Sequence, residues 1–286
     1  MTPPLLKSRV KLANGMTIPQ IQLGLYMVSR RDAKTSVHSA LEIGYRGFDC
    51  AQMYGNEQEA GKAIKDFLNS EANTERLTRE DIFYTTKLSS NSTSFDAVRK
   101  SITKSVQASG LGYVDLFLLH SPYGGRQARL TSWKAVEQAI KDGEVKMGGV
   151  SNYGVGHIEE LMSSSPAINP VINQIEVHPF NTQEEIRAVC AKYDITIEAY
   201  APLARGMRMK HPKILELSRK HRCSPAQLFV KWSLQHNMVT LPKSVKKERI
   251  IENASVEGFE ISQQDMAAMD DLDENLVTDW DPTDAP

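Results

Sequence analysis

Short apolar runs recur along the chain and alternate with segments of helical periodicity. Between the runs, Val37, Ala40 and Leu41, and again Val98 and Ile102, follow the spacing of one buried helix face. Short runs that are apolar on both faces and separated by helices are typical of parallel β-α units. The pattern therefore predicts an α/β fold, a closed (β/α)8 TIM barrel, with strands at 21–25, 46–48, 82–86, 114–119, 145–150, 171–175, 195–200 and 238–241.

Two segments fall outside this alternation. The stretch ANGM at 13–16 has the composition of a hairpin turn, so an N-terminal β-hairpin is expected before the first unit. The final stretch, DENLVTDWDPTDAP at 273–286, is acidic and rich in turn residues, and we expect a short tail on the surface or across a site. Since nothing resembles a linker, residues 1–286 are predicted to form a single barrel domain.

Composition and charge narrow the class of partner. Among 286 residues, 41% are hydrophobic and 24% charged, and the net charge of −1 provides no field for nucleic acid or an anionic membrane. The N-terminus has no signal-peptide pattern, and no apolar run reaches the roughly 18 residues of a membrane helix. The three cysteines, Cys50, Cys190 and Cys223, lack disulfide or zinc-site spacing. We expect a cytoplasmic protein with a small-molecule substrate and no metal.

Polar residues follow seven consecutive predicted strands at the same end. Singly each has an ordinary explanation, since Asp49 suits a cap, Lys87 a solvated strand end and His120 a satisfied histidine at the core edge. The ends of parallel strands share one rim, however, and barrel chemistry is built there from several strands. The sequence thus predicts a site at this rim containing Asp49, Lys87, His120, Ser151, Asn152, Gln174, Tyr200 and Lys243, with Tyr54 in the loop after Asp49.

Four of these side chains suggest one kind of chemistry. The phenol of Tyr54 is a weak acid with an ordinary pKa near 10, but an adjacent ammonium such as that of Lys87 favours its ionised form. Asp49 can hold that ammonium in place, and the His120 imidazole can orient a substrate carbonyl and stabilise its developing charge. No side chain is an obvious nucleophile, so a hydride from a cofactor is the expected reductant.

Several motifs together resemble one family. The stretches GFDCAQMYGNE, LLHSP, GVSNY, NQIEVHP, YAPL and LPKSVKKERIIEN, with Lys87 at a strand end, occur in the order seen in aldo-keto reductases, from about residue 8 to residue 273. The chain is similar to the microbial and fungal members, such as those of the 2,5-diketo-gluconate reductase type. The resemblance implies a (β/α)8 barrel and a catalytic tetrad of Asp49, Tyr54, Lys87 and His120, with Tyr54 as general acid.

The cofactor site is expected outside a doubly wound dinucleotide fold. The chain has no G-x-G-x-x-G after an early strand, whereas PKSVKKER at 242–249 places basic residues at the start of a predicted helix, which favours anions. A solvated basic helix start is the plainer interpretation. The resemblance implies NADPH, favoured over NADH because Arg249 suits a phosphate. It assigns to this cofactor Ser151, Asn152, Gln174, Tyr200, Leu203, Lys243, Ser244, Arg249 and Asn253.

The substrate pocket follows from the same resemblance, which assigns it Tyr26, Met53, Tyr123 and Trp280. For Met53 and Trp280, a role in ordinary packing explains the residue as well as a role in substrate binding does. Cys50 stands where many relatives carry Thr, and a buried inert thiol is favoured over a redox-sensitive one. Ser121 stands where many carry Trp, which predicts a wider carbonyl pocket. The family default is a monomer.

The predicted function is NADPH-dependent reduction of aldehydes, and of ketones or dicarbonyls, to alcohols. An NADPH-binding regulatory or structural protein on the same scaffold stays open as an alternative, because an undamaged tetrad argues against it without excluding it. A third interpretation makes Lys87 a Schiff-base nucleophile. That role needs a desolvated, uncharged lysine, whereas the neighbouring Asp49 favours the charged form.

Overall fold

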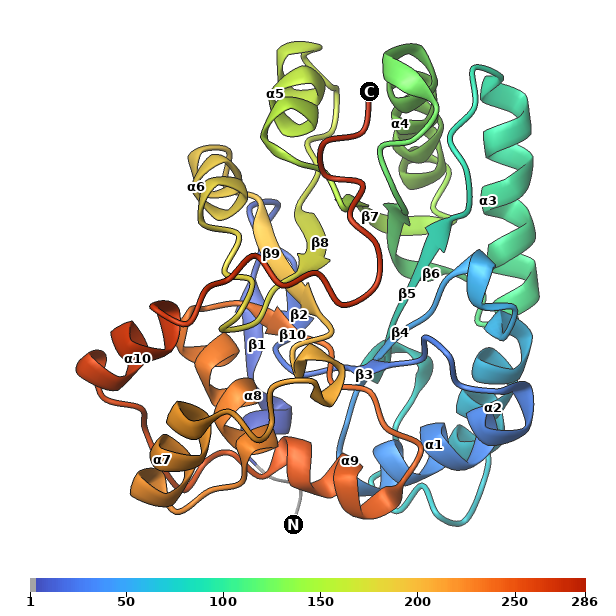
Figure 1. The fold of residues 1–286 in the computed structure, drawn as a ribbon. Helices are drawn as coiled ribbons and strands as arrows, with labels where there is room; N and C mark the ends of the chain where they lie inside the picture. Colours follow the sequence, from blue (N-terminus) through green and yellow to red (C-terminus); the bar gives the residue numbers. More distant parts are fainter. Residues whose placement is uncertain (1–3) are drawn as a thin grey trace.

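Eight parallel strands curl into a closed barrel in the computed structural model, which describes residues 4–286. The strands pair in descending order from β10 to β3, and a parallel bridge between Ile21 and Thr240 joins the first strand of the sheet to the last (Figure 1). The predicted (β/α)8 fold is therefore confirmed. The strands are β3 (Leu23–Gly24), β4 (Gly47–Asp49), β5 (Phe83–Leu88), β6 (Val114–Leu119), β7 (Val145–Ser151), β8 (Ile172–Glu176), β9 (Thr196–Tyr200) and β10 (Val239–Thr240).

Helices surround the barrel, and local sequence signals set their ends. Ser94 caps α3 through a hydrogen bond from the Ala97 N–H, and Gly110 ends that helix in the left-handed conformation. In the part of the chain that the structure describes, no helix is long and apolar enough to cross a membrane. The helices are α1 (Arg30–Ile43), α2 (Glu57–Leu68), α3 (Phe95–Ser109), α4 (Gly125–Lys141), α5 (Val155–Ser163), α6 (Glu184–Lys192), α7 (Pro212–His221), α8 (Pro225–Gln235), α9 (Lys247–Ala254) and α10 (Gln263–Asp270).

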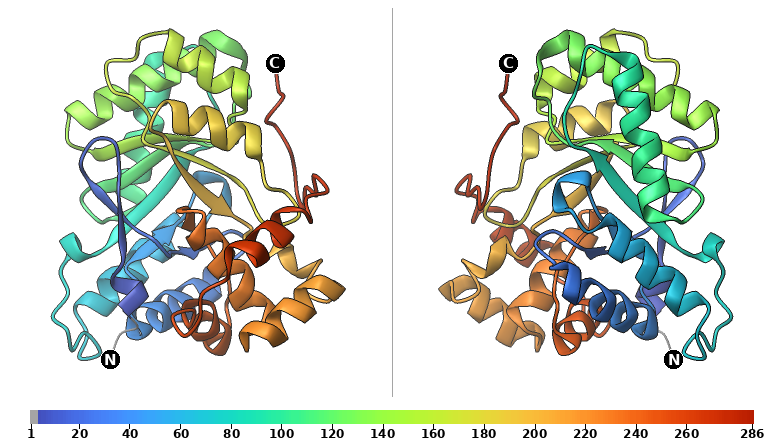
Figure 2. Two further views of the ribbon diagram at one scale, coloured as in Figure 1. Left: turned by 90° about the vertical axis from the view of Figure 1, so that its left-hand side faces the viewer. Right: turned by 90° about the vertical axis from the view of Figure 1, so that its right-hand side faces the viewer.

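The predicted N-terminal hairpin closes one end of the barrel. Strands β1 (Arg9–Lys11) and β2 (Thr17–Pro19) pair antiparallel around a turn in which Gly15 has a φ of 82°. Buried hairpin residues Leu12 and Ile18 pack with barrel residues such as Leu116. Figure 2 shows this hairpin and the C-terminal tail at opposite ends of the molecule. The N-terminal stretch in which no signal-peptide pattern is expected begins with residues 1–3, and these residues lie outside the described part of the chain.

The barrel interior has an apolar layer and a polar layer. Alternation along each strand sends Leu116 and Leu118 of β6 into the interior apolar cluster, whereas Phe117 and Leu119 pack against the surrounding helices. Nearer the carboxyl ends of the strands, the buried side chains include a group of polar ones. The apolar layer therefore supports a polar layer containing Asp49, Lys87, Gln174 and Glu198.

The C-terminal tail lies across one end of the barrel. This agrees with one of the two placements expected from the sequence, across a site rather than on the outer surface. After α10 the chain forms no helix or strand, and it crosses to α4 and α5 (Figure 1). Glu176 of β8 accepts hydrogen bonds from the N–H and hydroxyl of Thr278. Near the end of the chain, His157 Nε2 lies 2.7 Å from the Ala285 carbonyl oxygen, and Arg129 donates to the Pro286 oxygen. Contacts on three elements thus hold the tail over the strand ends.

Helices α2 and α3 approach so closely that only glycine fits at residue 61. A Cβ at Gly61 would lie 1.9 Å from the Ser109 carbonyl oxygen. Gly61→Ala is therefore expected to lower the free energy of unfolding by at least about 2 kcal/mol, since the backbone must move apart. Denaturant unfolding measures this change. Gly156→Ala on α5, where the new Cβ meets nothing within 4 Å, is the control. Equal losses in both variants would contradict the packing explanation.

Candidate active site

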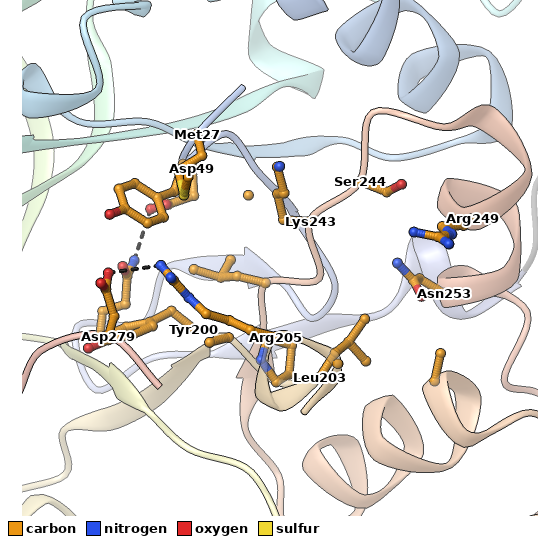
Figure 3. Close-up of a pocket in the computed structure, with 18 of the residues that line it drawn as sticks. Met27, Asp49, Tyr200, Leu203, Arg205, Lys243, Ser244, Arg249, Asn253 and Asp279 are labelled. Atoms are coloured by element: carbon orange, nitrogen blue, oxygen red, sulfur yellow. Dashed lines mark hydrogen bonds and ion pairs between the residues drawn. The ribbon is translucent and has the colours of Figure 1, made fainter. Parts of the chain in front are cut away.

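An elongated cavity of about 950 Å³ opens at the carboxyl ends of the strands. Asp49, Tyr54 and His120 line one part of it. Figure 3 shows Ser244, Arg249 and Asn253 grouped on one side of the close-up, with Asp49 on the other. The structure therefore places both groups of sequence-predicted residues in a single cavity.

A buried ion pair lies next to the cavity, and its Asp49 belongs to the cavity lining. Lys87 Nζ donates to both carboxylate oxygens of Asp49 at 2.7 Å and to the Cys50 carbonyl oxygen at 2.9 Å. The Lys87 side chain is 0% exposed. Paired strands β4 and β5 carry these two residues, so the sheet itself sets their separation. Tight pairing with a carboxylate favours the charged ammonium and opposes the Schiff-base interpretation of Lys87.

The hydroxyl of Tyr54 meets the same ammonium. Lys87 Nζ donates to Tyr54 Oη at 3.1 Å, and the Tyr54 ring lies 5.8 Å from the His120 ring. Burial, followed by the charge of Asp49, raises the pKa of Tyr54 well above 10.0. The sequence-based expectation of a lowered pKa is therefore wrong for this arrangement, because burial, and after it the charge of Asp49, disfavours the ionised phenol. Tyr54 keeps its proton at neutral pH.

His120 reaches the cavity in its uncharged form. Burial, followed by the charge of Lys87, lowers the pKa of His120 from 6.5 to about 3. The His120 carbonyl oxygen accepts a hydrogen bond from Asn152 Nδ2 at 3.0 Å, which fixes the backbone after β6. Its ring nitrogen Nδ1 has no partner among the described residues. A neutral imidazole has one N–H that can donate to a ligand oxygen.

Two cations without an ion-pair partner among the described residues line the cavity, Arg249 at its far end and Lys243 nearer Asp49 (Figure 3). Lys243, Ser244, Arg249 and Asn253 all line it, and α9 begins beside them. Lys243 and Arg249 are exposed, and within residues 4–286 neither has an ion-pair partner. Two free cations beside a helix start form a setting that favours a phosphate group.

The residues predicted for the middle of the cofactor site also line the cavity. Asn152 has a φ of 60°, and its Oδ1 accepts from the Tyr200 hydroxyl at 2.9 Å. Ser151 Oγ donates to the Gln174 carbonyl oxygen at 2.8 Å. These bonds orient the side chains before any ligand arrives. The cavity lining includes all five predicted members of this group: Ser151, Asn152, Gln174, Tyr200 and Leu203.

The predicted substrate residues divide into two sets. Tyr26, Met53 and Trp280 line the cavity, and Tyr26 packs on Tyr54 with ring centroids 5.1 Å apart. Tyr123 is absent from the cavity lining in the described chain and instead contacts Trp280 at 5.8 Å. Its position on the loop after β6 placed it near the rim, but only the folded tail shows that Trp280 stands between Tyr123 and the cavity residue His120.

The two departures from the family pattern are both buried. Cys50 is 0% exposed and donates to Asn56 Oδ1 at 3.0 Å, and burial raises the pKa of its thiol to about 12. The favoured interpretation of an inert thiol agrees with this environment. Ser121 is also buried and does not appear in the lining of the described cavity, so its effect on pocket width would be indirect.

Sequence reasoning missed several cavity residues. Arg205 and Asp279 pair at 2.8 Å across the cavity, joining the loop after β9 to the tail (Figure 3). No local pattern could have paired residues so far apart in the chain. Glu198 is buried outside the cavity lining, and it had a signal, because an acidic residue in the middle of the buried run ITIEAY must face an interior polar group.

Comparison with known proteins identifies the class. The Aldo/keto reductase family matches residues 20–274. An uncharacterized oxidoreductase of Schizosaccharomyces pombe is 45% identical, covering 99% of this chain and 100% of its own. A glyoxal reductase of Bacillus subtilis is 38% identical, covering 96% and 95%. An aldo-keto reductase of Bombyx mori in complex with NADP has a TM-score of 0.88 at 31% identity, covering 95% and 94%. The chain belongs to the aldo/keto reductase family of oxidoreductases.

The buried neutral state of His120 has a measurable consequence for stability. The unfolded chain takes up a proton near the ordinary pKa of 6.5, whereas the folded protein does so only near 3. Acid therefore favours the unfolded chain, and this residue should remove about 2 kcal/mol of stability between pH 7 and pH 5. Denaturant unfolding of wild type and His120→Gln measures the difference. If the free energy of unfolding fell by the same amount between pH 7 and pH 5 in both proteins, the lowered pKa of His120 would be contradicted.

Proposed function

We propose that this protein reduces aldehydes, and ketones or dicarbonyls, to alcohols with NADPH, using Tyr54 as general acid. The observation that carries the proposal is the contact between Tyr54 Oη and the Lys87–Asp49 ion pair, beside a neutral His120. A protonated phenol and an imidazole N–H can both approach one carbonyl oxygen. Such a pair of donors suits a reaction in which negative charge develops on that oxygen.

The cavity fits an elongated cofactor with a terminal phosphate. Arg249 lies with Ser244 at one end of the cavity and Asp49 at the other, and Lys243 lies between them (Figure 3). When bound, NADPH supplies the hydride for the carbonyl carbon. By resemblance to the family, Lys243, Ser244 and Arg249 would hold its 2′-phosphate and Asn253 its adenine edge. Ser151, Asn152 and Gln174 would bind the carboxamide, Tyr200 would stack on the nicotinamide, and Leu203 would add apolar contact.

The proton for the product alkoxide comes from Tyr54. Loss of that proton leaves a phenolate, and the ammonium of Lys87, 3.1 Å from the oxygen, stabilises it. Asp49 keeps Lys87 in position, so the ion pair acts through placement of the charge. His120 donates to the carbonyl oxygen and holds the substrate in register. The hydride and this proton together convert C=O to CH–OH.

The cavity rim favours substrates with an apolar part or a small dicarbonyl. Tyr26 and Met53 are 41% and 61% exposed at its mouth, and Trp280 extends over it from the tail. The similarity to a glyoxal reductase supports small dicarbonyls within this class. A single-domain monomer and a cytoplasmic location stay predictions of the sequence.

Removing the Tyr54 hydroxyl should abolish most turnover. Tyr54→Phe is expected to lower kcat about 100-fold or more while retaining NADPH binding, because only the proton donor is lost. The assay is NADPH oxidation with a panel of aldehydes, ketones and α-dicarbonyls, and fluorescence titration reports binding. Tyr193→Phe, at the end of α6, is the control. If wild type binds NADPH but reduces no member of the panel, a regulatory role replaces the enzymatic one.

The free cation at Arg249 should decide cofactor preference. Arg249→Gln is expected to weaken NADPH binding about 10- to 100-fold and to leave NADH binding nearly unchanged, since NADH lacks the 2′-phosphate. Titration of each cofactor against the apoprotein measures both affinities. Lys246→Gln provides a nearby cation outside the cavity lining as the control. An equal loss for both cofactors would place Arg249 away from the phosphate.

A further inference from the structure

A second buried carboxyl group lies one amide away from the ion pair. Glu198 of β9 is 0% exposed, and its Oε2 accepts from Gln174 Nε2 at 2.7 Å. The same Gln174 nitrogen donates to Asp49 Oδ1 at 2.9 Å. On its other side, Glu198 Oε1 lies 2.8 Å from Gln22 Nε2. Side-chain hydrogen bonds therefore run without a gap from Gln22 through Glu198, Gln174 and Asp49 to Lys87.

The charges of this network balance only if one carboxyl group is neutral. Both carboxylate oxygens of Asp49 accept hydrogen bonds from the ammonium of Lys87. Among the described residues, no second cation is paired with Glu198. Two buried carboxylates bridged by a single amide would repel each other in a medium of low polarity. Burial, followed by the charge of Asp49, raises the pKa of Glu198 from 4.5 to about 8. Glu198 is thus a neutral acid at pH 7.

A neutral Glu198 needs an acceptor for its hydroxyl, and Gln22 can provide one. The Oε1 atom of Gln22 is buried without a partner. Exchange of the amide nitrogen and oxygen leaves the shape of the side chain unchanged and turns Oε1 toward Glu198. Gln22 occupies space left open by Gly47, where a Cβ would lie 2.3 Å from Gln22 Cγ. Close packing therefore holds the Gln22 amide group beside Glu198.

We infer that Glu198 is a positioning residue for the proposed carbonyl reduction, because it holds the Gln174 amide between the ion pair and the cofactor cavity. The inference rests on the proposed function. Gln174 uses its nitrogen for both Glu198 and Asp49 and also lines the cavity. Without an acceptor at residue 198, that amide loses one of its two anchors. Movement of Gln174 would then disturb both Asp49 and the bound nicotinamide.

The same arrangement links the reaction to pH. Below about pH 8 Glu198 is neutral, and above it the carboxylate adds a second negative charge to the network. That charge raises the pKa of Tyr54, which makes its proton harder to release. Reduction should therefore slow as the pH rises through about 8. The polar and charged groups near Glu198 are Gln22 before β3, Asp49 of β4, Tyr54 in the loop after β4, Lys87 of β5 and Gln174 of β8.

Three variants of the full chain test the inference. Glu198→Leu removes both acceptors and is expected to lower kcat about 10- to 100-fold and to weaken NADPH binding, as a displaced amide predicts. Glu198→Gln keeps an acceptor and a donor, so it should rescue most of both losses. It cannot ionise, so the fall in kcat through about pH 8 should disappear. Thr240→Val is the control, because that buried hydroxyl has no partner in the described residues.

Turnover, its pH profile and NADPH affinity are measured for each variant, with thermal unfolding to confirm folding. Wild-type kinetics and affinity in Glu198→Leu would overturn the positioning role while leaving the proposed function intact. So would a loss in Glu198→Gln as large as that in Glu198→Leu. If wild type reduces no carbonyl, the proposed function fails. Weaker NADPH binding by Glu198→Leu alone, with Thr240→Val unchanged, would still support the hold of Glu198 on Gln174.

Discussion

The ion pair between Lys87 and Asp49 is the interaction on which the candidate site depends. Both side chains are buried, so loss of one partner would leave an uncompensated charge at a cost of about 3–5 kcal/mol. The neighbouring strands β4 and β5 supply the two residues, and the ammonium also meets Tyr54. The pair therefore joins the sheet to the loop that carries the proposed acid. After burial, its two charges are further causes of the pKa shifts of Tyr54 and His120.

The remaining structure keeps this pair dry and correctly oriented. Apolar residues and the N-terminal hairpin fill the opposite end of the barrel, which leaves the polar layer with cavity on one side only. The tail covers part of that cavity, and the bonds from Thr278 to Glu176 place Trp280 6.2 Å from His120. The low polarity of this site lowers the pKa of His120 and raises the pKa of Tyr54. It keeps His120 uncharged and Tyr54 protonated, which are the states that the proposed carbonyl reduction needs.

Much of the fold followed from local pattern. Each predicted strand run overlaps an observed strand, because apolar runs and helical spacing are encoded within a few neighbouring residues. The gathering of Asp49, Lys87 and His120 also followed, since parallel strands end at one rim. Tyr123 shows where this reasoning stops. Proximity to the rim was predictable, but its separation from the cavity depends on a tail that folds back from the far end of the chain.

The sequence by itself determined the barrel, the hairpin and the set of polar residues at the strand ends, because periodicity and the order of motifs are local properties. Only the tertiary structure decided the ionisation states and the long-range partners. Burial reversed the expected pKa shift of Tyr54, and the Arg205–Asp279 pair and the neutral Glu198 joined residues from separate elements. The physical reason is that a pKa depends on the surrounding polarity and charges, and folding brings both from distant parts of the chain.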